Sequence, residues 1–297
     1  MTVLAADIGG TKVAVARVDE EGAVVGPVLT APTPAHADGR AVVDLVASLL
    51  REARTPDVTA VGVAAAGVID TDAGTVTHAT SSIAGWAGTA LGPELASRTG
   101  LPVTVVGDGH AFGLGETRLG AARGHGSALV LVAGTGIGGS FVDRGRVLFG
   151  ARWSGGHFGH LAVPGADGVP CPCGATGHLE AIAGGPGVVG QYHRLGGDPS
   201  VTRVEDLPDD DAARQAVEAG GAAIGTVAGG LANAFDPGIV VIAGGLTKLG
   251  PVWETALRRR FEANLMGALS GVPLVVSDAD AWFSLRGAAL ATRGLIR

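Results

Sequence analysis

The chain contains 297 residues, of which 46% are hydrophobic, so it is long enough for one large domain or two ordinary ones with a real core. The net charge is −7 and the basic residues form no cluster, which argues against nucleic acid as the main partner because phosphate binding needs a basic face. No apolar run approaches the roughly 20 residues of a membrane span, and the N-terminal residues lack a charged leader and a cleavage site. We therefore expect a soluble, cytoplasmic protein that binds neither a membrane nor a nucleic acid.

The first half of the chain alternates short strands with helices. Val, Ala and Ile runs broken by glycines predict strand, turn, strand, turn, strand over 3–25. Apolar residues at helical spacing then predict a helix over 39–54. The remaining expected elements of this half are a strand at 61–65, a helix near 91–99, a strand at 103–106 and a helix over 109–119.

The second half repeats this plan. Residues 127–150, SALVLVAGTGIGGSFVDRGRVLFG, again predict strand, glycine turn, strand, turn, strand. A long insertion at 150–181 follows, then a helical region that ends at Asp236-Pro237, and a buried strand at 239–243. Alternating strands and helices in two similar halves predict a duplicated α/β protein with two lobes around a cleft.

Two glycine turns, DIGGTK at 7–12 and GTGIGG at 134–139, each lie between two predicted strands. Neither is a Rossmann fingerprint, because that motif needs a following helix. Tight glycine turns present backbone N–H groups that an anion can approach without hindrance. One such turn is more simply a hairpin, but two turns at equivalent places of a repeat favour a polyphosphate-binding site.

A third glycine pair, Gly244-Gly245, follows a buried strand and could let an adenine or ribose lie against the backbone. The expected phosphate- and nucleotide-binding residues of these segments are Gly9, Gly10, Thr11, Lys12, Gly134, Thr135, Gly136, Gly244 and Gly245.

The insertion concentrates residue types that bind metals. Five candidate zinc ligands and a glutamate occur in it, namely His157, His160, Cys171, Cys173, His178 and Glu180. A structural zinc takes four protein ligands in a tetrahedron, so the set holds one ligand too many. Two cysteines separated by one residue are poor disulfide partners but can face one metal ion, which suits a reducing compartment.

The chain resembles the sugar kinases of the ROK (repressor, open reading frame, kinase) family, which have an actin-like, ribonuclease-H-like fold. The resemblance covers nearly the whole chain: DIGGTK, GVID with a later GTV, GDGHAFGLGE, GTGIGG, HLAV to CPCGATGHLEA, and DPGIVVIAGG. It implies a homodimeric sugar 6-kinase that uses ATP and Mg²⁺ and acts on a small-molecule sugar, although some relatives use polyphosphate as the donor. We expect an N-terminal lobe of residues 1–117 and 284–297, with the first phosphate turn and the catalytic Asp, and a C-terminal lobe of residues 118–283, with the second turn, the zinc loop and the nucleotide-binding glycines.

The resemblance assigns roles to two aspartates. Phosphoryl transfer to a hydroxyl needs a carboxylate that takes the proton. Asp108 ends a strand and begins a helix, so the residue pattern alone fits a catalytic base and a helix N-cap equally well; the family has its base at the matching position. Asp7 matches the family residue that orients Mg²⁺, and its alternative is a turn-forming Asp. On the sugar side, the family's usual Asn before the base is Gly107 here, and Gly67 lies in VAAAGVID, where many glucose kinases have a Pro before the Gly.

The resemblance also sorts the residues of the insertion. In the family, a Glu-x-Gly-His motif supplies a sugar-binding Glu and a zinc-ligating His, followed by CxCGxxGC and a second sugar-binding Glu. The match implies a structural zinc, with a histidine in place of the third cysteine, and the alternative is a metal-free loop. The implied zinc ligands are His160, Cys171, Cys173 and His178, and the implied sugar contacts are His157, His160 and Glu180.

His157 occupies the position of the first sugar-binding Glu. A single change of this kind is compatible with drift, but it replaces an obligate acceptor with a group that can donate. The segment GGHFGH is similar to the bacterial N-acetylmannosamine kinase branch of the family, and a donor suits an acetamide carbonyl. We therefore expect N-acetylmannosamine as the substrate, with glucose and N-acetylglucosamine as alternatives.

Two other functional classes are alternatives to a kinase. The first is a sugar-responsive repressor, whose helix-turn-helix domain has no room before Asp7. The second is a non-catalytic sugar-binding protein, and the presence of Asp108 and of both glycine turns argues against it.

Overall fold

The computed structural model of the chain describes residues 2–280 and 282–294. By their contacts, the described residues form two compact units. The first comprises Met1–Gly124, Ser140–Gly156 and Asp280–Arg297, and the second comprises His125–Gly139 and His157–Ala279. The sequence predicts other domain boundaries, at 117/118 and 283/284, and these stay a prediction.

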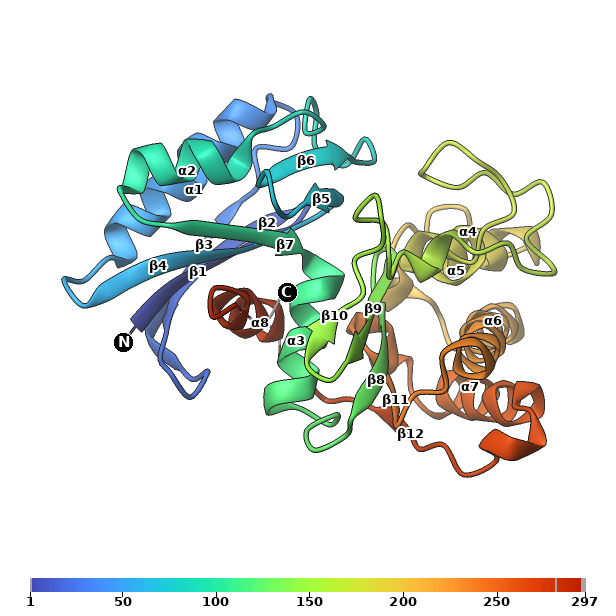
Figure 1. Ribbon diagram of the computed structural model, residues 1–297. Coiled ribbons are helices and arrows are strands. Elements are labelled where there is room, and N and C mark those ends of the chain that lie inside the picture. The colour runs from blue at the N-terminus through green and yellow to red at the C-terminus, as the bar shows by residue number, and fades with distance from the viewer. Residues whose placement is uncertain (1, 281, 295–297) are drawn as a thin grey trace. The chain divides into compact units, whose positions relative to one another are not determined.

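Five strands of the first unit form a sheet in the order β3-β2-β1-β4-β7 (Figure 1). The strands are β1 (Thr2–Ile8), β2 (Lys12–Val18), β3 (Val24–Pro32), β4 (Val58–Ala65) and β7 (Val103–Gly107). β2 is antiparallel to β1 and β3, whereas β1, β4 and β7 are parallel. Their carboxyl ends are level, because Ile8 pairs with Ala65 and Ala65 pairs with Gly107. A short hairpin of β5 (Val68–Asp70) and β6 (Thr75–His78) follows β4.

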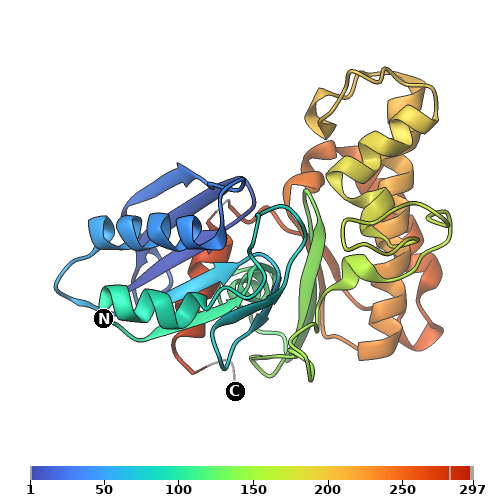
Figure 2. The same cartoon turned by 90° about the horizontal axis from the view of Figure 1, so that it is seen from above.

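Helices cover both faces of the first sheet. α1 (Gly39–Ala53) and α2 (Leu91–Thr99) pack together on one face, and α8 (Phe283–Ala291) lies on the other, against α3 (Asp108–Leu119) (Figure 1 and Figure 2). Asp38 caps α1 by accepting a hydrogen bond from the N–H of Ala41 at 3.0 Å. The apolar face of α1 is fully buried, and each such side chain contributes about 1.5–3 kcal/mol. The buried apolar residues of α1 include Val42, Val43, Val46 and Leu50.

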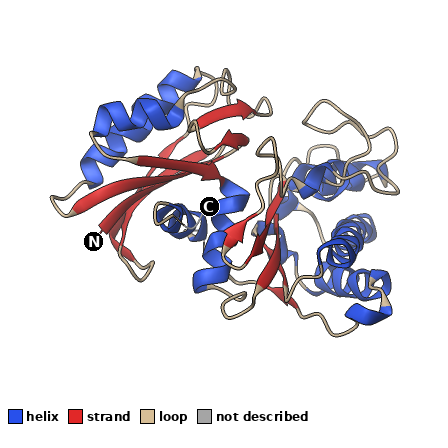
Figure 3. Cartoon of the chain, in the orientation of Figure 1, coloured by secondary structure: helices blue, strands red, loops and turns tan. Residues whose placement is uncertain are grey.

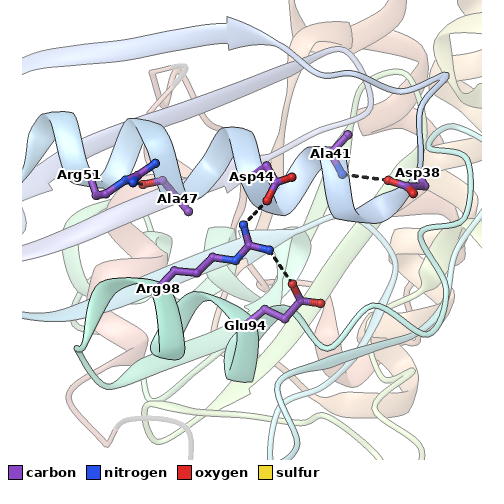
Figure 4. Close-up of polar contacts among 7 residues, drawn as sticks. All are labelled: Asp38, Ala41, Asp44, Ala47, Arg51, Glu94 and Arg98. Atoms are coloured by element: carbon purple, nitrogen blue, oxygen red, sulfur yellow. Dashed lines mark hydrogen bonds and ion pairs between the residues drawn. The ribbon is translucent and has the colours of Figure 1, made fainter.

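Arg98 of α2 joins α1 and α2 at the surface (Figure 4). Its guanidinium pairs with Asp44 of α1 and with Glu94 one turn earlier in α2, the latter at 2.9 Å. These side chains are partly exposed, so solvent screens both ion pairs. The two helices are therefore held mainly by the apolar residues that they bury against the sheet.

The second described sheet repeats the order of the first. Its order is β10-β9-β8-β11-β12. The strands are β8 (Ser127–Ala133), β9 (Ile137–Asp143), β10 (Arg146–Val147), β11 (Val240–Ala243) and β12 (Leu274–Val276). β11 runs parallel to β8 and β12, and β10 is antiparallel to β9. The duplicated plan predicted from the sequence is thus confirmed.

Helices of the second unit pack around a long central one. They are α4 (Glu180–Ala183), α5 (Gly185–Arg194), α6 (Asp211–Phe235) and α7 (Pro251–Asn264), with 3-10 turns η1 (Phe158–His160), η2 (Val204–Asp206), η3 (Gly245–Leu249) and η4 (Gly267–Leu269). α6 lies beside α7 in both views (Figure 1 and Figure 2). Glycines make this approach close: an added Cβ at Gly225 would lie 2.1 Å from the carbonyl oxygen of Leu257.

The insertion between β10 and α4 is mostly loop (Figure 3). Its regular structure consists of η1 and two isolated bridges, Ala162 with His178 and Pro170 with Thr176. Helices predicted at 39–54, 91–99 and 109–119 are found, and the helical region predicted between the insertion and Asp236-Pro237 contains α5 and α6. In contrast, α7, α8 and the β5-β6 hairpin were not anticipated. Among the described residues, no helix combines the length and the apolar character needed to cross a membrane.

Candidate active site

The first glycine turn joins β1 to β2 and is held by backbone and side-chain contacts. The N–H of Gly9 donates to the carbonyl oxygen of Lys12 at 3.0 Å. Thr33, directly after β3, donates from its hydroxyl to the carbonyl oxygen of Gly9 at 2.7 Å and from its N–H to that of Thr11 at 3.0 Å. The N–H of Gly9 is used inside the turn, so an anion would be met by the N–H groups of the residues that follow Gly9.

Asp7 and Asp108 lie at one edge of the first sheet. Asp7 is the next-to-last residue of β1 and is half-buried. Asp108 directly follows β7, is exposed, and begins the 12-residue helix α3. The cap position of α3 is Gly107, which has no side chain to make a capping bond. Gly107 is therefore the N-cap residue, while Oδ1 of Asp108 accepts the N–H of Gly109 at 2.7 Å. The carboxylate of Asp108 lies at the positive end of the helix dipole.

The two carboxylates influence each other. Burial, and then the negative charge of Asp108, raise the pKa of Asp7 to about 7, and the ammonium of Lys12 opposes this effect. A half-buried carboxylate with a negative neighbour is a suitable ligand for a hard divalent cation, whose charge relieves the repulsion. The oxygen donors at this edge thus fit Mg²⁺.

Replacing Asp7 by Asn is expected to stabilise the protein in Mg²⁺-free buffer at pH 8. The folded-state pKa of about 7 exceeds the unfolded value of 3.8, so wild-type stability decreases as the pH rises from about 4 to 7. Asn carries no such cost, and the gain at pH 8 is on the order of 1–3 kcal/mol, vanishing near pH 4. Urea unfolding at several pH values measures it, with the exposed Asp143→Asn as control. A gain that grows toward acidic pH would contradict the account.

Gly67 and Gly107 lie close together at the same sheet edge. An added Cβ at Gly107 would be 3.7 Å from the carbonyl oxygen of Gly67. Gly67 has a φ of +106°, and an added Cβ there would lie 2.6 Å from the carbonyl oxygen of His78, so this position requires glycine. Trp86 is 1% exposed and donates from Nε1 to the carbonyl oxygen of Ala66 at 2.8 Å. The tryptophan thereby fixes the segment that carries Gly67.

His110 lies next to Gly107, the position at which the family resemblance implies an asparagine. An added Cβ at Gly107 would lie 3.1 Å from Nδ1 of His110. Nε2 of this buried imidazole is 2.6 Å from the carbonyl oxygen of Gly155, and the ring meets Phe149 edge-on with 4.8 Å between ring centroids. His110 thus ties the start of α3 to the glycine segment that precedes His157 in the chain.

The second glycine turn joins β8 to β9, beside the end of β11. β8 and β11 are parallel, and their last pair is Val132 with Ala243. Gly244 follows at a φ of +99°, and an added Cβ there would lie 2.3 Å from the carbonyl oxygen of Ala133. Only glycine permits this approach. The structure therefore places Gly244 next to the residue that begins the second turn, Gly134.

Four metal-ligand residues of the insertion converge within the second unit. The candidate ligand atoms of His160, Cys171, Cys173 and His178 all lie within 4.8 Å of one another. Sγ of Cys171 is 3.6 Å from Nδ1 of His160, and Sγ of Cys173 is 3.3 Å from Nδ1 of His178. Ligands of a tetrahedral zinc, with Zn–S of about 2.3 Å and Zn–N of about 2.0 Å, are about 3.5 Å apart. The set fits zinc in donor type and in spacing.

The electrostatics of this cluster favour a cation. Burial raises the pKa of the Cys171 thiol to about 11, so a thiolate there needs a compensating positive charge. Burial also lowers the pKa of His160, which favours the neutral imidazole that ligates metals. A divalent ion supplies the missing charge without a protonated histidine.

His157 and Glu180 flank the cluster within the second unit. The half-buried His157 ring lies nearly parallel to that of His160, with 6.2 Å between centroids and 21° between planes. Glu180 begins α4, and its Oε2 accepts a hydrogen bond from the N–H of Ile137 at 2.8 Å. The glutamate of the insertion therefore reaches the end of the second glycine turn.

The structure thus collects the predicted site residues in two groups. The first unit holds Asp7, Gly9, Gly10, Thr11, Lys12, Gly67, Gly107 and Asp108, and the second holds Gly134, Thr135, Gly136, His157, His160, Cys171, Cys173, His178, Glu180, Gly244 and Gly245. The sequence did not reveal the contacts of Thr33 and Trp86, whose partners are 24 and 20 residues away. The sequence did contain a signal that His110 belongs to the site. It lies two residues after Asp108, and histidines are few in this chain, which has eight.

Comparison with known proteins gives the family. The model of the ROK family matches residues 3–294. The glucokinase of Streptomyces coelicolor is 31% identical over 288 residues, covering 88% of this chain and 87% of the relative. The N-acetylmannosamine kinase of Citrobacter koseri is 35% identical over 189 residues, covering 63% of each chain.

A solved structure agrees with these relatives. The ROK family glucokinase from Streptomyces griseus, in complex with glucose and AMPPNP, superimposes with a TM-score of 0.85 at 28% identity, covering 99% of this chain and 100% of that one. The actin-like, two-lobed ATPase fold predicted from the sequence is confirmed. The chain therefore belongs to the ROK family and is an ATP-dependent carbohydrate kinase.

Proposed function

We propose that the chain transfers the γ-phosphoryl group of ATP to the 6-hydroxyl of N-acetylmannosamine. The observation that carries this choice of sugar is His157, which stands beside the metal cluster where the family pattern has a carboxylate. Glucose is the second candidate, because the glucokinase relative aligns over 88% of the chain and the N-acetylmannosamine kinase relative over 63%.

In the proposed reaction, the carboxylate of Asp108 accepts the proton of the 6-hydroxyl. The sugar oxygen forms a bond to the γ-phosphorus, the bond between that phosphorus and the bridging oxygen breaks, and ADP leaves. Support comes from the position of Asp108: it is exposed, it begins α3, and its Oδ1 accepts the N–H of the next residue, Gly109, at 2.7 Å. At the start of a helix, the dipole attracts the negative charge of a carboxylate.

The phosphates of ATP are assigned to the two glycine turns. Thr33 holds the first turn and Glu180 contacts the second, so both are fixed before a ligand arrives. Asp7 would hold Mg²⁺, which, when bound, neutralises charge on the β- and γ-phosphates. Fixed donors around a group that accumulates negative charge lower the barrier without reorganisation.

The metal cluster is assigned a structural role. Four protein ligands fill a tetrahedral zinc, so no position is left for substrate. His160, Cys171, Cys173 and His178 would hold the ion and thereby fix the loop between His157 and Glu180. The two flanking residues are then placed to contact the sugar.

His157 provides the argument for an acetamido sugar. A carboxylate only accepts hydrogen bonds, which suits the hydroxyl of glucose, whereas an imidazole N–H donates to a carbonyl oxygen. A site that pairs a donor with a carbonyl discriminates against a sugar without one, because the donor then loses its partner.

A panel of sugars tests the proposal. ADP release with N-acetylmannosamine, N-acetylglucosamine, glucose, mannose and fructose is expected to give the highest kcat/KM for N-acetylmannosamine. His157→Glu is expected to shift the ratio of kcat/KM values toward glucose by about 10-fold or more, because it removes the donor and restores the acceptor. The matched control His157→Gln keeps an N–H donor and should retain the preference. A wild-type kcat/KM for glucose equal to or above that for N-acetylmannosamine would refute the choice of sugar.

A further inference from the structure

The side chain of Glu180 contacts the second glycine turn directly. Its Oε2 accepts the N–H of Ile137 at 2.8 Å, and Ile137 is the first residue of β9, immediately after the turn. The two residues are 43 positions apart in the chain. A hydrogen bond to a carboxylate is about twice as strong as one between neutral groups. The carboxylate therefore fixes the end of the turn.

The segment that starts with Glu180 also holds the beginning of the turn. The N–H of Gly185 donates to the carbonyl oxygen of Gly134 at 2.9 Å. An added Cβ at Gly184 would lie 2.8 Å from the carbonyl oxygen of Thr135, so the two backbones touch. Residues 180–185 thus contact the turn at both of its ends.

Gly136, the last residue of the turn before β9, makes room for this carboxylate. An added Cβ at Gly136 would lie 2.5 Å from Oε2 of Glu180. Any larger residue at this position would displace the carboxylate or the turn. Glycine at 136 therefore leaves the Glu180 carboxylate in its place against the turn, whereas a side chain there would push this carboxylate aside.

We infer that Glu180 is a positioning residue for the phosphate-binding turn, in addition to its assigned contact with the sugar. The inference rests on the proposed function in one respect, that the turn binds the phosphates of ATP. A carboxylate has two oxygens, so Oε2 can hold Ile137 while the other accepts a sugar hydroxyl. His178 lies two residues earlier in the chain, so the loop that carries the metal ligands continues directly into the segment that holds the turn.

Nucleotide binding without sugar separates the two roles of Glu180. Titration calorimetry with Mg·AMPPNP is expected to show an affinity about 10-fold weaker for Glu180→Ala, which leaves the Ile137 N–H without its acceptor. Glu180→Gln keeps an acceptor oxygen and should lose less than about 3-fold. Glu262→Ala, an exposed glutamate on α7, serves as the control and should match wild type.

Hydrogen exchange gives a readout that needs no ligand. The backbone amide of Ile137 is expected to exchange faster in Glu180→Ala than in wild type, and at nearly the wild-type rate in Glu180→Gln. If Glu180→Ala matches wild type in exchange and in nucleotide affinity, and only the KM for sugar rises, the positioning role is overturned. Failure of wild type to bind the nucleotide would instead contradict the proposed function, while the exchange rates would still decide the role of Glu180.

Discussion

Replacing Asp108 by Asn is expected to lower kcat by about 10³-fold and to change the KM for sugar by less than about 3-fold. Asn has the shape of Asp but cannot accept a proton, so the loss falls on the chemical step. The residue is exposed at the start of α3, and Asn keeps an oxygen that can accept the N–H of Gly109, so we expect the variant to fold. Steady-state kinetics with N-acetylmannosamine and ATP measure the effect.

The variant also has a consequence for Asp7. The negative charge of Asp108 is one of the causes that raise the pKa of Asp7, so removing it should lower that pKa. Asp209→Asn, at a side chain that is 99% exposed, is the matched control and should leave kcat unchanged. If Asp108→Asn keeps more than about a tenth of the wild-type kcat, Asp108 is not the base.

Replacing His178 by Ala is expected to abolish zinc binding and to weaken sugar binding by about 10- to 100-fold. The variant leaves three ligands of the cluster, and the loop between His157 and Glu180 loses its cross-link. The midpoint of thermal unfolding should fall by about 5–15 °C, since binding energy of a structural metal is folding energy. Metal analysis of the purified protein, calorimetry with the sugar and a thermal melt give the three values.

Two further variants make this result specific. His178→Cys restores the cysteine that the family pattern has at this place and should keep the zinc, because both side chains are good ligands. His36→Ala, an exposed histidine of the first unit, should change none of the three values. Zinc-free wild-type protein with unchanged sugar affinity would contradict the structural role of the cluster.

Much of the fold could be predicted because its signals are local. Glycines at 9, 10, 134 and 136 break strands at equivalent places, and the helix predicted over 39–54 matches the bounds of α1 within one residue. The shortest strands and helices were missed because they lack such local signals. β12 has three residues and α4 has four, and such elements depend on their neighbours rather than on a periodic pattern of their own.

The contacts that fix the site could not be predicted from a local pattern. Thr33 holds the first turn from 24 residues away, and Glu180 holds the second from 43. Both are ordinary polar residues in their own segments, and only the folded topology brings them to their partners. His110 had a local signal, since it follows Asp108 by two residues, but its contact with Gly155 spans 45 positions.

One measurement tests the central claim that this chain phosphorylates an acetamido sugar with ATP. Wild-type protein is incubated with ATP, Mg²⁺ and N-acetylmannosamine, with Asp108→Asn as the blank, and phosphorus and carbon NMR follow the products. The account predicts ADP and a sugar phosphorylated on the 6-oxygen in equal amounts, with at most a trace in the blank. Absence of ADP with both N-acetylmannosamine and N-acetylglucosamine, whether or not glucose reacts, would contradict it.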